Sequence, residues 1–564
     1  MRLFCSSKLR NTKNLSGLWD FVIDTDRVGY QEKWYELFPE KREKICVPFC
    51  WNSVPEYFKY EGLAWYQTVF EATSDTYLLT FENVLNEAEV YVDGICVKHH
   101  YGGFLGFQVE GRGKGKHILT VAVDNTHNEK NTIPLSRVDW FHYGGIAGNV
   151  YLDCFKDCYI SDHRIDYEMT GNRALVNVEF NIIGEYVGKV QIYLGEELVA
   201  ETDAHSGKNN LKVDFGFIER WDIFKPNLYL VEIRIEGDSV VERIGFRKIE
   251  VRGKQILLNG REIKIKGINR HNEHPDFGFA VPFSMMKKDV DIIKNMGANL
   301  IRGSHYPNPP ELLDYLDEIG MLFWEEIPMW GFYDKTSLGE PLTMERGIQM
   351  HEEMIRRDCH HPSIVFWGLH NEIGTDIEEG YDITKSFYEV VRALDSSRPI
   401  TFASLKVESD VCLEFADIVS MNIYPGWYGG HDPKKESEEI INKIQNHLEK
   451  VGSHNKPFII SEFGAGAIFG EHSLYNAKWT EEYQAELLQE LITAFEKDEN
   501  INGMIIWQYC DIRSSFELEL TRPRSYNNKG LVNEYRQPKT AFYTVSRLFN
   551  KIDVNQEGDY DENI

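Results

Sequence analysis

The chain has 564 residues and a formal net charge of −28 at pH 7, with 42% hydrophobic and 13% aromatic residues. So acidic a chain would repel nucleic acid and anionic membrane surfaces, and we expect neither as a partner. The apolar content is ample for packed cores, and the length corresponds to about three or four domains of roughly 150 residues each. A disordered or fibrous protein is excluded.

We expect a cytoplasmic protein. No run of about 18 to 20 apolar residues predicts a membrane span, and the first residues lack the apolar core of a secretory signal. The nine cysteines are odd in number and dispersed, which favours free thiols in a reducing compartment. Cys46 and Cys50, like Cys154 and Cys158, form C-x3-C pairs, but no further ligand follows at zinc-site spacing. We therefore interpret them as buried strand cysteines and predict no metal.

Two all-β modules are predicted in the first half of the chain. Short alternating runs such as 76–84 and 117–125 are separated by Gly, Asn and Asp turns. This pattern predicts antiparallel strands that close into a jelly-roll β-sandwich over residues 1–158. Similar runs continue over residues 159–252, a length that suits a small immunoglobulin-like β-sandwich.

From residue 253 the period changes, because apolar strand-like runs alternate with amphipathic helical stretches such as 283–297 and 481–497. Eight β/α units predict a closed (β/α)8 TIM barrel over residues 253–564. The acidic final segment 555–564 is predicted to be disordered. The eight strand-like runs are 263–269, 298–304, 321–328, 363–372, 399–405, 418–425, 458–464 and 503–511.

Glu372 ends the fourth of these runs, and Glu462 lies two residues before the end of the seventh. Functional side chains gather at the C-terminal ends of barrel strands, and a carboxylate there is costly unless it is used or paired. Singly, each could cap a helix or bind an arginine. Together they predict a pair for glycosidic bond cleavage, one protonating the leaving oxygen and the other meeting the developing oxocarbenium carbon. Five aromatic residues in or just after strand ends could stack on a sugar, although each alone is explained equally well by ordinary packing at the rim of the barrel. They are Trp330, Tyr424, Trp427, Tyr428 and Trp507.

An ordered set of motifs runs through the barrel, and the N-terminal half carries further ones. On this set the chain resembles glycoside hydrolase family 2, the group that holds β-galactosidases, β-mannosidases and β-glucuronidases, over nearly its whole length. The N-terminal motifs resemble that family's sugar-binding jelly roll. The barrel motifs lie at 267–271, 302–307, 361–363, 371–372 and 461–464, and the N-terminal ones at 17–19, 81–94, 139–141 and 143–146.

The resemblance implies that Glu372 is the acid/base and Glu462 the nucleophile of a retaining double displacement, which needs no cofactor. Repulsion between carboxylates roughly 5 Å apart should raise the pKa of Glu372. By the same resemblance Asn371 hydrogen-bonds the sugar 2-hydroxyl and Tyr424 orients or discharges Glu462. We interpret His271 and His274 as hydrogen-bonded pocket wall instead of metal ligands, and we expect a homo-oligomer. Other residues expected at the substrate are Asp139, His305 and Trp507.

The clue to the sugar is Asn527-Asn528-Lys529-Gly530, after the eighth run. As a bare pattern it predicts a surface turn. In its position it resembles the Asn-x-Lys signature by which β-glucuronidases hold the C6 carboxylate. An anionic sugar approaching so acidic a protein needs a local cation, and Lys529 with the Asn527 amide would offer charge-assisted hydrogen bonds. Arg522 and Arg524 could add positive potential, and Tyr428 matches another position of that pocket.

The leading hypothesis is a retaining exo-β-glucuronidase that hydrolyses small-molecule or oligosaccharide β-glucuronides. A β-galactosidase or β-galacturonidase of the same family is the alternative, because residues 267–275 look closer to β-galactosidases. The short segment after Trp330 suggests an open aglycone side. A catalytically silent carbohydrate-binding protein is a third hypothesis, and the presence of both glutamates argues against it.

Overall fold

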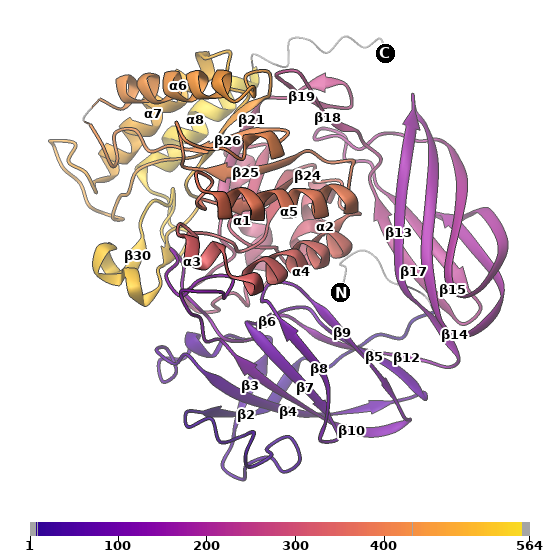
Figure 1. Cartoon of the computed structure of the whole chain (residues 1–564). Helices are drawn as coiled ribbons and strands as arrows, with labels where there is room; N and C mark the ends of the chain where they lie inside the picture. The colour runs from indigo at the N-terminus through magenta and orange to yellow at the C-terminus, as the bar shows by residue number, and fades with distance from the viewer. Residues whose placement is uncertain (1–6, 8, 431, 555–564) are drawn as a thin grey trace.

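The computed structural model describes residues 7, 9–430 and 432–554, so the acidic segment 555–564 lies outside the described residues. Figure 1 shows a barrel ringed by helices, with one β-sandwich below it and a second β-sandwich at its right. Within the described residues no helix is long and apolar enough to cross a membrane. All eight cysteines of this part of the chain are free, including both C-x3-C pairs.

The lower sandwich consists of two antiparallel sheets packed around one core. Its strands alternate between buried and exposed side chains, as in β9, where Phe107 and Val109 are buried and Gln108 is exposed. Large aromatic side chains, among them Trp19 and Trp51, fill the space between the sheets. The six-stranded sheet has the order β3 (Glu43–Val47), β2 (Gly17–Asp24), β4 (Leu63–Ala72), β10 (Gly115–Asp124), β7 (Glu87–Val92) and β8 (Ile95–Tyr101). The four-stranded sheet has the order β1 (Lys13–Asn14), β12 (Val150–Phe155), β5 (Thr76–Phe81) and β9 (Phe107–Arg112).

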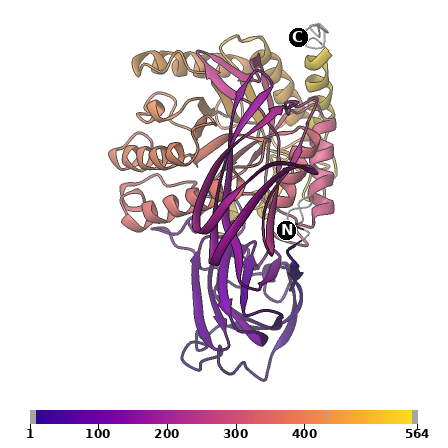
Figure 2. The ribbon, with the colours of Figure 1, turned by 90° about the vertical axis from the view of Figure 1, so that its right-hand side faces the viewer.

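The second sandwich is built on two long strands, β14 (Arg173–Leu194) and β15 (Glu197–Phe217). The register between them shifts after Ile182, and there β14 changes partners. Its first half pairs with β13 (Cys158–Thr170), and its end pairs with β16 (Tyr229–Ile235). Strand β17 (Asp238–Ile244) pairs with β16, and the layers enclose a separate apolar core. Figure 2 shows this sandwich along the side of the barrel.

The barrel closes through eight parallel strands, and all eight runs predicted from the sequence form them. Both helices predicted from apolar spacing are present, as α1 (Phe283–Asn295) and α7 (Glu481–Lys497). The strands are β21 (Ile265–Arg270), β22 (Leu300–Gly303), β23 (Leu322–Glu326), β24 (Ile364–Asn371), β25 (Ile400–Ser404), β26 (Val419–Asn422), β27 (Phe458–Phe463) and β28 (Gly503–Ile506). The other helices of the outer ring are α2 (Pro310–Ile319), α4 (Pro341–Asp358), α5 (Glu378–Leu394), α6 (Pro433–Lys450) and α8 (Thr540–Val554).

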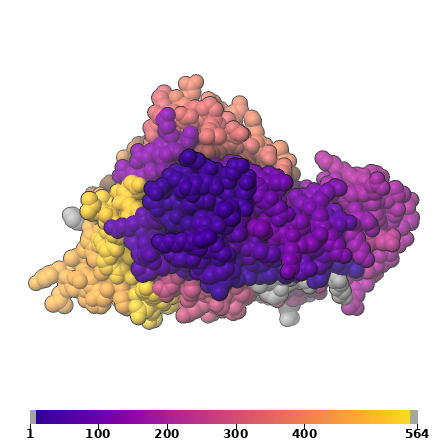
Figure 3. All heavy atoms as spheres, turned by 90° about the horizontal axis from the view of Figure 1, so that it is seen from below, coloured from indigo at the N-terminus to yellow at the C-terminus, as the bar shows by residue number. Residues whose placement is uncertain are grey.

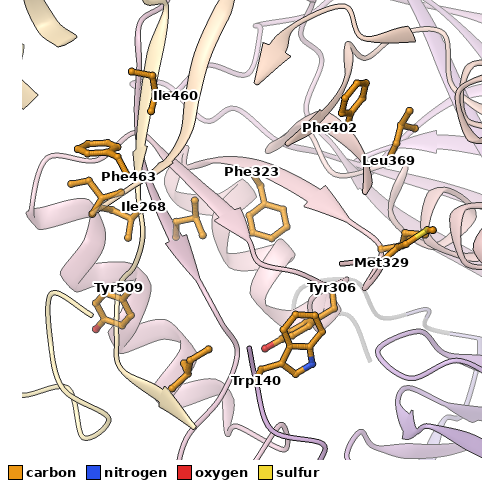
Figure 4. Packing of buried hydrophobic residues seen from close by; sticks show 14 of the residues in the cluster. Trp140, Ile268, Tyr306, Phe323, Met329, Leu369, Phe402, Ile460, Phe463 and Tyr509 are labelled. Carbon is orange, nitrogen blue, oxygen red and sulfur yellow. The ribbon is translucent and has the colours of Figure 1, made fainter. Parts of the chain in front are cut away.

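Two loops of the first sandwich pack directly on the barrel. The ring of Phe104 stacks on that of Tyr306 with centroids 4.0 Å apart, and Trp140 meets Tyr306 edge-on at 6.1 Å. Figure 4 shows Trp140 beside Tyr306, among buried side chains that extend to Phe323. Figure 3, from below, shows the sandwich covering much of the lower face of the molecule. Because these contacts are buried, they fix the segment around Trp140 relative to the barrel strands.

Candidate active site

A cavity of about 410 Å³ opens at the C-terminal ends of the barrel strands. Its walls come from the barrel and from the first sandwich, which contributes Asp139. The residues that line it are Asp139, His305, Trp330, Glu372, Leu405, Val407, Asn422, Ile423, Tyr424, Tyr428, Gly429, Glu436, Ile440, Glu462, Trp507, Arg522 and Lys529. Both candidate catalytic glutamates are therefore in one cavity.

Glu372 lies immediately after β24, where its backbone adopts the left-handed region at φ 50°. Its carboxyl accepts hydrogen bonds from Asn422 Nδ2 at 2.8 Å and Trp330 Nε1 at 3.2 Å, both of them neutral donors. Burial raises the pKa of Glu372 to about 7, and the nearby charge of Glu462 adds to the rise. Glu372 is therefore a carboxyl group that can hold a proton near neutral pH.

Glu462 stands in β27 with different partners. Its Oε1 accepts a hydrogen bond from Arg302 Nη1 at 2.9 Å, and its Oε2 accepts one from Tyr424 OH at 2.6 Å. Burial raises the pKa of Glu462, but the Arg302 guanidinium and the Tyr424 hydroxyl oppose that rise. Because one of its donors is cationic, Glu462 is the more readily ionised of the two glutamates.

A third buried carboxylate, Glu326 at the end of β23, holds Arg302 in place. Its two oxygens accept from Arg302 Nε at 3.0 Å and Nη2 at 2.8 Å, and its Oε1 lies 2.8 Å from His305 Nδ1. Burial lowers the pKa of His305 well below its usual value. The ring is therefore neutral near pH 7 and is hydrogen-bonded through Nδ1 to Glu326.

Asn371 is fixed by the same network. Its Oδ1 accepts from Arg302 Nη2 at 2.8 Å and from Asn422 Nδ2 at 3.1 Å. Its Nδ2 is buried and has no hydrogen-bond partner among the described residues. A buried N–H without an acceptor costs about 1 to 3 kcal/mol, so this amide has a donor left for another group.

Lys529 lines the cavity beside Tyr424 and Tyr428, and it is only 3% exposed. Its Nζ donates to Tyr428 OH at 3.0 Å and lies 5.2 to 5.8 Å from the ring centroids of Tyr424, Trp427 and Tyr428. No carboxylate of the described residues forms a salt bridge with it. A buried cation surrounded by aromatic faces, without an acidic partner, provides an anion-binding position.

Asp139 completes this part of the cavity from the first sandwich. It accepts from Arg522 Nε at 3.0 Å and Nη2 at 2.6 Å, and from Asn527 Nδ2 at 2.7 Å. The Oδ1 of Asn527 in turn accepts from the backbone N–H of Lys529 at 3.2 Å. The pair of Asp139 and Arg522 therefore adjoins the free cation.

Eight of the ten residues predicted at the site line the cavity, and two do not. Asn371 and Asn527 are buried and are not among the lining residues; Arg302 donates to Asn371, and Asn527 donates to Asp139. The Asn527 amide, expected to face the sugar, instead donates from Nδ2 to the Asp139 carboxylate at 2.7 Å. The eight predicted residues that line the cavity are Asp139, His305, Glu372, Tyr424, Tyr428, Glu462, Trp507 and Lys529.

The prediction that His271 and His274 form the pocket wall is wrong, because neither lines the cavity. His271 is buried behind His305 and Trp507, with its Nδ1 3.1 Å from Tyr306 OH. Arg524, expected to add positive potential, pairs instead with Glu534. Sequence reasoning missed Glu326 and Asn422, although both stand at strand ends, which is the signal that found Glu372 and Glu462.

Two groups of histidine and acidic side chains converge elsewhere, and none of their members lines the cavity. Each group is already joined by hydrogen bonds, His163 Nε2 lying 2.9 Å from Glu242 and His361 Nδ1 2.5 Å from Asp317. Sequence spacing could not reveal them because their members come from distant elements. The groups are His163, Glu242 and His360, and Asp314, Asp317 and His361.

Comparison with known proteins agrees with this geometry. The family model "Glycosyl hydrolases family 2, TIM barrel domain" matches residues 249–554, and "Glycosyl hydrolases family 2" matches residues 158–247. A curated beta-glucuronidase of Paenibacillus borealis is 28% identical, with 94% of this chain and 96% of that protein covered.

Two solved structures extend the comparison. A GH2 beta-galacturonidase from Eisenbergiella tayi bound to galacturonate superposes with a TM-score of 0.90 at 34% identity, over 98% of this chain and 99% of that one. The Ruminococcus gnavus beta-glucuronidase gives a TM-score of 0.88 at 28% identity, over 97% of this chain and 98% of that one. The predicted three-part architecture is thereby confirmed. Since the barrel model alone covers more than half of its residues, the chain belongs to family 2 of the glycosyl hydrolases, which are glycoside-cleaving enzymes.

Proposed function

We propose that the protein is a retaining exo-β-uronidase, with β-D-glucuronides as its leading substrates. One observation carries this proposal: the buried, acid-free ammonium of Lys529 shares a cavity with Glu372 and Glu462. The C6 carboxylate of a uronic acid would supply the anion that Lys529 lacks, with a charge-assisted hydrogen bond. A neutral sugar would leave that cation unpaired.

In the proposed first step, the ionised Glu462 attacks the anomeric carbon as the bond from that carbon to the aglycone oxygen breaks. Glu372 gives its proton to the departing oxygen, and a glycosyl ester forms on Glu462. In the second step Glu372 takes a proton from water, whose oxygen bonds to the anomeric carbon. The ester bond breaks and Glu462 leaves as a carboxylate.

The residues around the two glutamates support these roles. Arg302 and Tyr424 favour ionisation of Glu462, whereas the neutral donors on Glu372 do not oppose its protonation as strongly. The spare Nδ2 donor of Asn371 suits the sugar 2-hydroxyl next to the anomeric carbon. Release of terminal residues is favoured because Asp139, Arg522 and Lys529 occupy the end of the cavity where a longer chain would have to continue.

A β-galacturonidase is the second candidate, favoured by the 34% identity to the E. tayi enzyme bound to galacturonate. Glucuronate and galacturonate share the C6 carboxylate and differ at the C4 hydroxyl. Both would satisfy Lys529, so the carboxylate argument holds for either sugar.

A panel of aryl β-glycosides with one leaving group tests the proposal. We expect the glucuronide or the galacturonide to exceed the glucoside and the galactoside in kcat/KM, and the preferred uronide assigns the C4 configuration. Equal or faster turnover of the galactoside would refute a uronidase. Absence of turnover for all four sugars, together with measurable sugar binding, would favour a silent carbohydrate-binding protein.

A further inference from the structure

A buried ion pair beside Lys529 is used by none of the steps above. Lys539, from the segment 536–539, lies with its Nζ 2.8 Å from Oδ1 of Asp511. Both side chains are fully buried, and neither lines the cavity. Desolvation of two buried charges offsets most of their attraction, so such a pair is explained better by the geometry that it fixes than by stability.

The ammonium group of Lys539 uses all three of its protons on segments that adjoin Lys529. Besides Asp511, it donates to the carbonyl of Asn528 at 3.1 Å and to that of Ala467 at 2.6 Å. Asn528 directly precedes Lys529, and Ala467 follows β27. An ammonium group has three N–H donors and no acceptor, so its hydrogen bonds are complete here. Lys539 therefore joins three segments of backbone next to the cavity.

Asp511 fixes the other side of Lys529. Its Oδ1 accepts from the backbone N–H of Gly530 at 2.9 Å, in addition to the Lys539 ammonium. The packing there is so close that a Cβ on Gly530 would lie 2.3 Å from the backbone nitrogen of Asp511. The residues before and after Lys529 are thus both held by one buried ion pair.

The pair holds this segment without adding a binding charge to the cavity. The Lys539 cation is paired with Asp511 and has no donor left, so it does not compete with Lys529 for an anion. Lys529 itself has a long side chain whose ammonium must meet a carboxylate at hydrogen-bond distance. A misplacement of about 1 Å can cost about a hundredfold in rate, so the position of its backbone matters for the reaction.

We propose that Lys539 and Asp511 are positioning residues, which hold Lys529 in place for the C6 carboxylate of the substrate and act on the sugar only through Lys529. This inference rests on the proposed uronidase function, because that function assigns Lys529 to the substrate carboxylate. A purely structural role of the pair would lower activity whether or not Lys529 is present.

A double-mutant cycle tests the inference with the aryl β-uronide that the wild-type protein prefers. Lys539→Met keeps a chain of similar length and removes the three donors, and we expect it to lower kcat/KM about tenfold. In the Lys529→Ala background the same change should lower kcat/KM by less than about twofold, because the group that Lys539 positions is gone. Equal factors in the two backgrounds would show a structural role and would overturn the inference.

Lys456→Met is the matched control. Lys456 also donates to three backbone carbonyls, but it precedes β27 and so lies at the end of the strands opposite the cavity. We expect kcat/KM of this variant to stay within about twofold of the wild-type value, even if its Tm falls. A tenfold loss would mean that the loss of any such lysine lowers activity, which also contradicts the inference. The three carbonyls belong to Leu413, Glu414 and Ala416.

The double variant Asp511→Asn, Lys539→Met guards against misfolding, because it leaves no unpaired charge in the interior. It loses the same donors to Asn528 and Ala467, so the loss on the uronide should persist once a circular dichroism melt shows folded protein. Recovery of the wild-type kcat/KM would overturn the inference. If neither variant folds, the whole barrel requires the pair, and its assignment as a positioning device is overturned as well.

The outcomes also separate the two proposals. If the wild-type protein hydrolyses no uronide, or if Lys529→Ala lowers the uronide and the neutral glucoside equally, the proposed function fails and the inference fails with it. If Lys529→Ala lowers the uronide selectively, but Lys539→Met has no effect or the same effect in both backgrounds, the inference alone is refuted.

Discussion

Asp139 and Arg522, 383 positions apart in the chain, form a two-hydrogen-bond ion pair at the edge of the catalytic cavity. Asp139 comes from the first sandwich and Arg522 from the segment after the last barrel strand. The pair holds a sandwich loop against the barrel, and it keeps Arg522 from competing with Lys529 for an anion. The geometry of the sugar end therefore depends on both domains.

Replacement of Asp139 by Asn should lower kcat/KM for the preferred uronide by about ten- to a hundredfold. The substitution removes the charge that pairs with Arg522 and leaves a buried amide facing the amide of Asn527. Steady-state kinetics with the aryl uronide measures the effect. The control is Arg524→Gln in the same segment, where an exposed pair with Glu534 should change kcat/KM less than about twofold. Equal effects of the two variants would contradict a special role for Asp139.

Replacement of Glu462 by Gln should reduce kcat by about a thousandfold or more, because the amide is a far weaker nucleophile than the carboxylate. The fold should survive, since Arg302 keeps both hydrogen bonds to Glu326. Single-turnover kinetics and a circular dichroism melt measure the two properties on one preparation. Turnover close to that of the wild-type protein would rule out Glu462 as the nucleophile.

Ionisation of Glu372 should produce the alkaline limb of the pH profile of kcat/KM. Its pKa is raised to about 7, and it must be protonated to assist departure, so kcat/KM should fall as pH rises through roughly that value. In Glu372→Gln the limb should vanish when the substrate has an activated aryl leaving group that needs no acid. A limb that persists in that variant would mean that another group titrates.

The same pKa shift predicts a pH-dependent difference in stability. A carboxyl whose pKa is raised on folding, here from 4.5 to about 7, contributes stability that is complete below the lower value and is lost as pH rises through the higher one. The glutamine of Glu372→Gln cannot ionise. The free energy of unfolding of this variant, relative to that of the wild-type protein, should therefore be about 2 to 3 kcal/mol higher at pH 8 than at pH 5. Urea unfolding of both proteins at the two pH values gives this difference, and a constant difference would contradict it.

Removal of the Lys529 ammonium should lower activity on a uronide but not on a neutral glycoside. In Lys529→Ala the uronide loses a charged hydrogen bond, at a cost of about 1.5 to 3 kcal/mol, or about ten- to a hundredfold in kcat/KM. The matching neutral glucoside never used that contact and should be unaffected or improved. Kinetics with both sugars on the one variant decides the matter, and an equal loss for both would remove the reason to propose a uronic acid.

Much of the architecture could be predicted from sequence because its signals are local. Each barrel strand is a short apolar run bounded by turns, and Glu372 and Glu462 interrupt such runs with a charge. Glu326 carries the same strand-end signal, but its role could not be assigned from sequence, because that role depends on Arg302 from the neighbouring strand and on His305 beyond it. The orientation of Asn527 likewise depends on Asp139, which only the folded chain brings near it.

The docking of the sandwich loop beside Trp140 and Tyr306 has a consequence for protein engineering. A barrel excised at residue 253 would lose Asp139 and with it one wall of its own catalytic cavity, so the catalytic unit of this enzyme is larger than its barrel. Chimeras that exchange the N-terminal sandwich between relatives would therefore transfer part of the sugar selectivity along with it, even when every barrel residue stays the same.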